Sequence, residues 1–162
     1  MSVVTAPDMP WLMQEAIDWL DSIMRPYYEV LETGAGASTI FLARRAKMVI
    51  SFEHDEEWYR TVNRKLKAEN LPCVLTFDPN YPANGLGNLA RRFDLALIDG
   101  RGRNRSVSDG LLALLPGGWL VLDDSDRERY APSRQLMDSL SSCKIVFRSG
   151  PDETTAWRKR KD

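Results

Sequence analysis

The chain has 162 residues, a length that suits one domain. Hydrophobic residues make up 43% and charged residues 28% of it, so the composition excludes a disordered chain and supplies a core. The net charge of −1 gives no overall attraction to nucleic acid. We find neither a membrane-length apolar run nor a signal peptide. We therefore expect a cytoplasmic protein that acts without nucleic acid or membrane.

Apolar periodicity predicts alternating helices and strands along the chain. Helices are expected at 10–24, after the turn at 32–39, at 56–69, at 106–115 and around 136–140. Strands are expected at 28–32, 48–52, 73–77, 93–98, 119–122, 143–147 and 154–157. Cys73 and Cys143 lie in two of these strands without the spacing of a disulfide framework or a metal site. We expect both to be buried thiols in a reducing compartment.

The spacing of the strands predicts the fold class. The first six begin about 23 residues apart on average, which is the length of a βαβ unit. Only a turn separates the last two strands, so they must be antiparallel neighbours. We expect an α/β fold, a three-layer, doubly wound and mostly parallel sheet of seven strands with an antiparallel C-terminal strand. It would form one domain, 1–162, with an N-terminal helical segment (1–26) and a core (27–158).

Acidic residues stand where the first five strands end. They are Glu32, Glu53, Asp78, Asp99 and the pair Asp123 and Asp124. Ligands of open α/β sheets bind outside the carboxyl ends of the strands. A single acid at such a position is commonly a helix cap or a turn former. Because five or six of them together would repel one another, the row indicates a positively charged ligand, a metal ion, or both.

The first turn, ETGAGAST at 32–39, narrows the choice of ligand. Gly34 and Gly36 allow a tight turn and the close approach of a ligand, but Thr39 stands where a dinucleotide motif has its third glycine. Glu32 would repel a pyrophosphate, whereas it suits the ammonium and sulfonium groups of S-adenosylmethionine (SAM). Glu53, at the end of the second strand, can accept hydrogen bonds from ribose hydroxyls.

The segments VLETGAGAST, SFEHD, FDLALIDG and LLPGGWLVLDD together resemble the motifs of class I, Rossmann-like, SAM-dependent methyltransferases, and among them small members related to the O-methyltransferases. The resemblance covers 30–124. It implies SAM as the cofactor and a set of cofactor-binding residues: Glu32, Gly34, Gly36, Ser38, Glu53, His54, Asp78 and Asp99. In that family, the methionine part of SAM would lie at 32–38, the ribose at Glu53, the adenine near His54 and Asp78, and the methyl group near Asp99.

Methyl transfer requires an acceptor held in line with the methyl group and the removal of an acceptor proton. We expect Asp99 to be the catalytic residue, as base, acceptor-orienting group or metal ligand. Asp99, Asp123 and Asp124 would converge at neighbouring strand ends, an oxygen set that suits Mg²⁺ or Ca²⁺, as in catechol-type O-methyltransferases. That family has Asp-Asn at the last two positions, and Asp124 or Asp126 can instead cap the following helix.

Several alternatives stay open. The basic segment 101–105 either binds a carboxylate or phosphate of the acceptor or pairs with the acids of the rim. The preferred function is methyl transfer from SAM to a small-molecule acceptor at oxygen. The alternatives are a non-catalytic module that binds SAM or a nucleoside, and an NAD-dependent oxidoreductase. A subunit partner, as in a homodimer, would complete the acceptor pocket if one chain does not.

Overall fold

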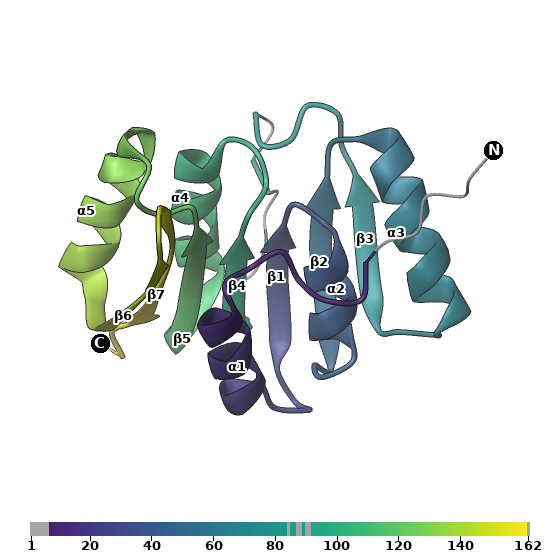
Figure 1. The fold of residues 1–162 in the computed structure, drawn as a ribbon, viewed down its shortest axis with the longest axis horizontal. Coiled ribbons are helices and arrows are strands. Elements are labelled where there is room, and N and C mark those ends of the chain that lie inside the picture. Colours follow the sequence, from purple (N-terminus) through teal and green to yellow (C-terminus); the bar gives the residue numbers. More distant parts are fainter. Residues whose placement is uncertain (1–6, 84, 87–88, 90–91, 162) are drawn as a thin grey trace.

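Seven strands form one sheet in the order β3-β2-β1-β4-β5-β7-β6 (Figure 1). They are β1 (Glu29–Thr33), β2 (Met48–Glu53), β3 (Cys73–Phe77), β4 (Phe93–Ile98), β5 (Leu114–Asp123), β6 (Ser141–Ser149) and β7 (Asp152–Lys159). The structure is a computed structural model that describes residues 7–83, 85–86, 89 and 92–161. Strands β1 to β5 pair in parallel, and β7 runs antiparallel to β5 and β6. The expected fold class is confirmed.

Helices cover both faces of the sheet. They are α1 (Gln14–Ile23), α2 (Ala37–Ala43), α3 (Glu56–Ala68), α4 (Arg103–Ala113) and α5 (Ala131–Leu140), with a 3₁₀ turn, η1 (Glu128–Tyr130), before α5. Alternate residues of each strand point to opposite faces. On β4, Leu95 and Leu97 therefore join a core with α1, α2 and α3, whereas Ala96 and Ile98 join a second core with α4 and α5. The result is the three-layer arrangement.

Helix α1 begins at Gln14 rather than at Pro10. Met13 has an extended backbone, with ψ at 142°, so the segment before it is not helical. The indole of Trp11 instead stacks on that of Trp58, with ring centroids 6.1 Å apart. This contact between the N-terminal segment and α3 competes with the start of the helix that periodicity predicts.

Strand β5 is longer than the expected strand at 119–122, and helix α4 begins at Arg103 instead of at 106. The strand starts at Leu114, which pairs with Phe93, and its register shifts after this pair. The Pro116-Gly117-Gly118 sequence therefore lies inside the strand at an irregularity, where proline and glycine are tolerated. From the sequence alone, these three residues indicate the end of the preceding helix, so the start of the strand is predicted at 119 instead of 114.

The cysteines are both free, but they are not both buried. Cys73 is half-buried and Cys143 is exposed. Cys143 lies on β6, the edge strand of the sheet, so the prediction of a buried thiol there is wrong. None of the helices in the described ranges is long and apolar enough to cross a membrane.

Candidate functional site

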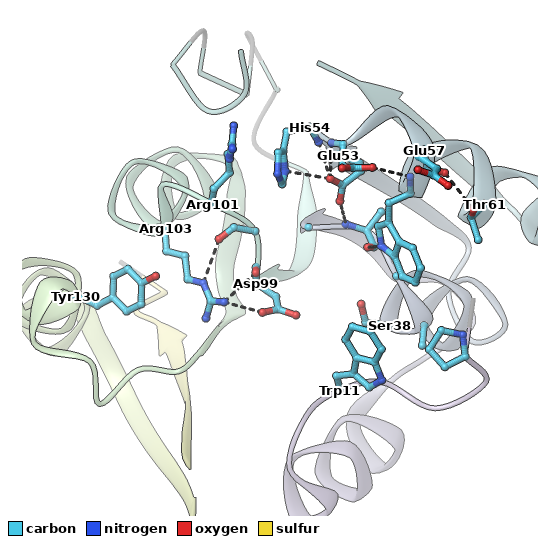
Figure 2. Close-up of a pocket in the computed structure, with 18 of the residues that line it drawn as sticks. Trp11, Ser38, Glu53, His54, Glu57, Thr61, Asp99, Arg101, Arg103 and Tyr130 are labelled. Atoms are coloured by element: carbon cyan, nitrogen blue, oxygen red, sulfur yellow. Dashed lines mark hydrogen bonds and ion pairs between the residues drawn. The ribbon is translucent and has the colours of Figure 1, made fainter. Parts of the chain in front are cut away.

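A cavity of about 750 Å³ opens at the carboxyl ends of β1, β2 and β4 (Figure 2). This is the edge at which open α/β sheets bind ligands, and the volume is in the range of small-molecule sites. Six of the eight residues expected to bind a cofactor line it: Gly34, Gly36, Ser38, Glu53, His54 and Asp99. Glu32 and Asp78 do not belong to the lining.

Gly34 allows the turns after β1 and β4 to touch. Its φ is +84°, and a Cβ atom there would stand 2.6 Å from the backbone nitrogen of Gly100, so an L-residue would push the two turns apart. Gly36 has an extended backbone, with φ at 178°. A Cβ atom on Gly36 would make only an ordinary contact with Trp58, at 3.8 Å. Only the first of the two glycines is therefore required by the packing of the protein itself.

Glu32 is completely buried beneath the first turn. Its carboxylate accepts hydrogen bonds from the hydroxyls of Ser38 (2.5 Å), Thr39 (2.5 Å) and Ser51 (2.6 Å). Burial raises the pKa of Glu32 to about 7, against the effect of these hydrogen bonds. Glu32 therefore fixes the turn and orients Ser38, which lines the cavity, and its own carboxylate does not reach the cavity wall.

The carboxylate of Glu53 joins the turn after β1 to the start of α3. Oε2 accepts the N–H of Ala35 at 3.1 Å, and Oε1 accepts the N–H groups of His54 and Asp55, each at 2.8 Å. The Nδ1 atom of His54 lies 3.0 Å from Oε1. A carboxylate oxygen has two lone pairs, so Oε2 retains the capacity to accept one more hydrogen bond from a ligand.

Asp78 has a different role from the one expected of it. Its Oδ1 accepts the N–H of Asn80 at 2.8 Å, and its own N–H donates to the carbonyl of Glu53. These contacts shape the turn that follows β3. A contact between Asp78 and adenine stays a prediction that the lining of the cavity does not support.

A buried arginine occupies the place that was expected to hold a metal ion. Nη2 of Arg103 lies 2.9 Å from Oδ1 of Asp99, and Nη1 lies 3.1 Å from Oδ2 of Asp124 and 3.8 Å from Oδ2 of Asp123. Its Nε donates to the carbonyl of Gly100. Because the guanidinium of Arg103 already lies among these carboxylates, the structure does not support the expected Mg²⁺ or Ca²⁺ site at Asp99, Asp123 and Asp124. In the described ranges, no three His, Cys, Asp or Glu side chains form a metal-binding group.

Neither of the expected acids caps α5. The residue at its N-cap is Tyr130, with no side-chain capping bond. Asp124 instead pairs with Arg103 and with Arg127, the latter at 2.8 Å. Its φ of +51° is in the left-handed region, which Asp tolerates better than most residues. The two ion pairs offset the cost of that conformation.

Asp99 is the carboxyl group with the most altered acidity on the cavity wall. Burial, followed by the charge of Asp123, raises the pKa of Asp99 to about 8. The Arg103 guanidinium opposes this rise and does not cancel it. Burial also raises the pKa of Asp123. Asp99 is therefore poised to exchange a proton near neutral pH, which is the property of a general base or acid.

Several residues of the cavity wall were not expected from the sequence, among them Trp11, Trp58, Arg129 and Tyr130. Trp58 packs against the core, and it also lines the cavity and donates its Nε1–H to the carbonyl of Ala35 at 2.6 Å. Arg129 and Tyr130 belong to no motif and arrive through the packing of η1 against α4. Among these residues, only Trp11 could have been noted from the sequence, as a large aromatic residue at the start of the expected helix.

Comparisons with known proteins concern the fold. No family model and no curated protein matches the sequence. A tRNA (m1A58) methyltransferase, TrmI, from Aquifex aeolicus superposes with a TM-score of 0.75 at 17% identity, over 98% of this chain and 73% of that one. A candidate methyltransferase from Streptococcus mutans, in complex with S-adenosylhomocysteine (SAH), superposes with a TM-score of 0.74 at 16% identity, over 93% of this chain and 99% of that one. A SAM-dependent O-methyltransferase from Thermotoga maritima superposes with a TM-score of 0.75 at 13% identity, over 94% of this chain and 67% of that one.

The chain has the fold of SAM-dependent methyltransferases. The order of the strands, the reversed β7 and the cavity at the carboxyl ends of β1, β2 and β4 belong to this fold. The fold that the sequence motifs implied is therefore confirmed.

The buried and exposed arginines of α4 offer a matched test of the Arg103 cluster. Arg103→Met should reduce the free energy of unfolding by about 3–5 kcal/mol, because it leaves buried carboxylates without their partner. Arg105→Met removes an exposed ion pair with Asp109 and should cost less than about 1 kcal/mol. Urea denaturation followed by circular dichroism measures both values. Equal losses for the two variants would contradict the role given to Arg103.

Proposed function

We propose that the protein binds SAM in this cavity and transfers its methyl group to a small-molecule acceptor, at an oxygen atom. The observation that carries the proposal is the meeting of three groups on one wall of the methyltransferase fold: the turn at 34–38, the carboxylate of Glu53 and the carboxylate of Asp99. Each comes from the end of a different strand. A wall built in this way offers separate contacts to the two halves of a nucleoside cofactor and to an acceptor.

The residues fit SAM in the following way. The turn at 34–38 would hold the methionine part, with the Ser38 hydroxyl oriented by Glu32. Oε2 of Glu53 has the free acceptor capacity that a ribose hydroxyl needs, and His54 beside it would border the adenine. The negative charge beneath and beside this half of the cavity favours the ammonium and sulfonium groups of SAM over a pyrophosphate. This is the reason to prefer SAM to NAD.

Asp99 is the group that acts on the acceptor. SAM, when bound, supplies a methyl group activated by its sulfonium charge. The acceptor oxygen would take this methyl group, with the sulfur of the cofactor as the leaving group, and the acceptor proton would pass to the carboxylate of Asp99. Arg103 touches the far side of that carboxylate and holds its orientation, so Arg103 is a positioning residue. Orientation of this kind is a large part of what an enzyme contributes to a displacement.

The identity of the acceptor is the finer part of the proposal. One structural neighbour is a tRNA methyltransferase, so the comparisons do not support the expectation that nucleic acid is excluded. A net charge of −1 favours a small molecule, because RNA-binding domains generally carry an excess of basic residues. The free thiols Cys73 and Cys143 fit the expected cytoplasmic location. A non-catalytic SAM-binding module is the second candidate.

Calorimetry with SAM, SAH and NAD tests the proposal directly. SAM and SAH should both bind with one-to-one stoichiometry, whereas NAD should give no heat of binding, because its pyrophosphate would lie near Glu32 and Glu53. Turnover measured as SAH release, over a panel of hydroxyl-bearing acceptors, separates an enzyme from a binding module. Binding of NAD alone would overturn the proposal.

Glu53 provides a test of the position of the ribose. Glu53→Ala should weaken SAH binding by about 1–3 kcal/mol, because the hydrogen bonds to the ribose are lost. Glu56→Ala is the matched control, since Glu56 is an exposed residue of helix α3 that pairs with Arg60 and does not line the cavity. Calorimetry gives both affinities, and a melting curve checks that each variant is folded. Unchanged SAH affinity in a folded Glu53→Ala variant would refute the assignment.

Asp99 should give the reaction its dependence on pH. The base is active only after losing its proton, so the rate of methyl transfer should rise with pH and level off above about 8. Asp99→Asn should reduce turnover about 10²–10⁴-fold and remove this rise, and SAH should still bind. The measurement is SAH release as a function of pH with an acceptor found in the panel. A wild-type rate independent of pH between about 6 and 9 would exclude Asp99 as the base.

A further inference from the structure

Two arginines on the cavity wall have no partner for their charge. Among the described arginines, only Arg101 and Arg129 have side chains that make neither a hydrogen bond nor an ion pair, and both line the cavity. Every other described arginine donates to a carboxylate, a hydroxyl or a backbone carbonyl. Arg129 does lie over the ring of Tyr130, at 4.9 Å, a contact that leaves its N–H donors available.

The backbones that carry these two side chains are held in place. The carbonyl of Arg101 accepts a hydrogen bond from the buried hydroxyl of Tyr81 at 3.2 Å. The carbonyl of Arg129 accepts one from Nδ2 of Asn104 at 2.8 Å, and Oδ1 of the same Asn104 accepts the hydroxyl of Ser133. Both exposed side chains therefore extend from fixed backbone positions at the edge of the cavity.

Charge divides the cavity into two halves (Figure 2). Glu53, Asp55 and Glu57 lie on the wall formed by β2 and α3. Arg101 and Arg129 lie on the opposite wall, formed by the start of α4 and by η1. Arg103 lies on this second wall too, but its charge is already used by Asp99 and Asp124. The acidic half suits a cationic cofactor, and the half with free arginines suits an anion.

We propose that the acceptor carries an anionic group, a carboxylate or a phosphate, which Arg101 and Arg129 bind while its hydroxyl lies at Asp99. This inference rests on the proposed function, because it names the chemical class of the second substrate at the same site. Guanidinium groups bind both anions with paired hydrogen bonds. Arg101 and Arg129 are exposed residues at the edge of the cavity. Two such arginines beside one cavity, on a chain of net charge −1, fit a small anion better than the phosphate backbone of RNA, which basic stripes recognise.

The test uses SAH-saturated protein and three small aromatic probes that each carry a phenolic hydroxyl: 4-hydroxyphenyl phosphate, 4-hydroxybenzoate and uncharged phenol. Calorimetry should show that at least one anion binds about tenfold more tightly than phenol. The double variant R101Q/R129Q should lose this difference while its SAH affinity is unchanged. Arg105→Gln is the control, because Arg105 is an exposed arginine of α4 that is paired outside the cavity. A preference for 4-hydroxyphenyl phosphate would identify the group as a phosphate, and a preference for 4-hydroxybenzoate as a carboxylate.

Three outcomes would overturn the inference. The first is equal binding of phenol and both anions to the wild-type protein. The second is an anion affinity that a folded R101Q/R129Q variant retains. The third is tight binding of a short single-stranded RNA that R101Q/R129Q abolishes, which would assign the arginines to nucleic acid. Failure of SAH to bind the wild-type protein would instead refute the proposed function, so the two failures are distinguishable.

Discussion

The ion-pair cluster around Arg103 is the interaction on which the arrangement of the site depends. A guanidinium with 9% of its side chain exposed costs free energy to remove from water. It is compensated by the carboxylates of Asp99 and Asp124 and by the carbonyl of Gly100. Because these partners come from the ends of β4 and β5, the cluster fixes the two strand ends relative to each other. It also fixes the direction in which Asp99 faces the cavity.

The fold and the centre of the site could be predicted from the sequence because both depend on local patterns. The strand spacing requires βαβ units, and the short link before β7 requires its reversal. Gly34 was predicted correctly because a tight turn with positive φ favours glycine wherever it occurs. Glu53 and Asp99 were placed on the cavity wall because the carboxyl ends of parallel strands share one edge of the sheet.

Other features could not be predicted because they depend on contacts between distant segments. Glu32 stands near a strand end in the sequence, but β1 continues to Thr33 and the pleat directs Glu32 under α2, where hydroxyls of α2 and β2 cover it. The sequence gives no sign that Arg103 would lie among three aspartates, since a basic segment is equally compatible with a solvated loop. Arg129 reaches the cavity only because η1 packs beside α4.

These corrections change the electrostatic basis of the proposed activity. The acids at the strand ends do not form one negative surface, because Glu32 is internal and Asp124 is neutralised by Arg103. Burial raises the pKa of Asp99 to about 8, so this group carries less negative charge near neutral pH than an ordinary aspartate. A neutral Asp99 does not repel an anionic acceptor that approaches between Arg101 and Arg129.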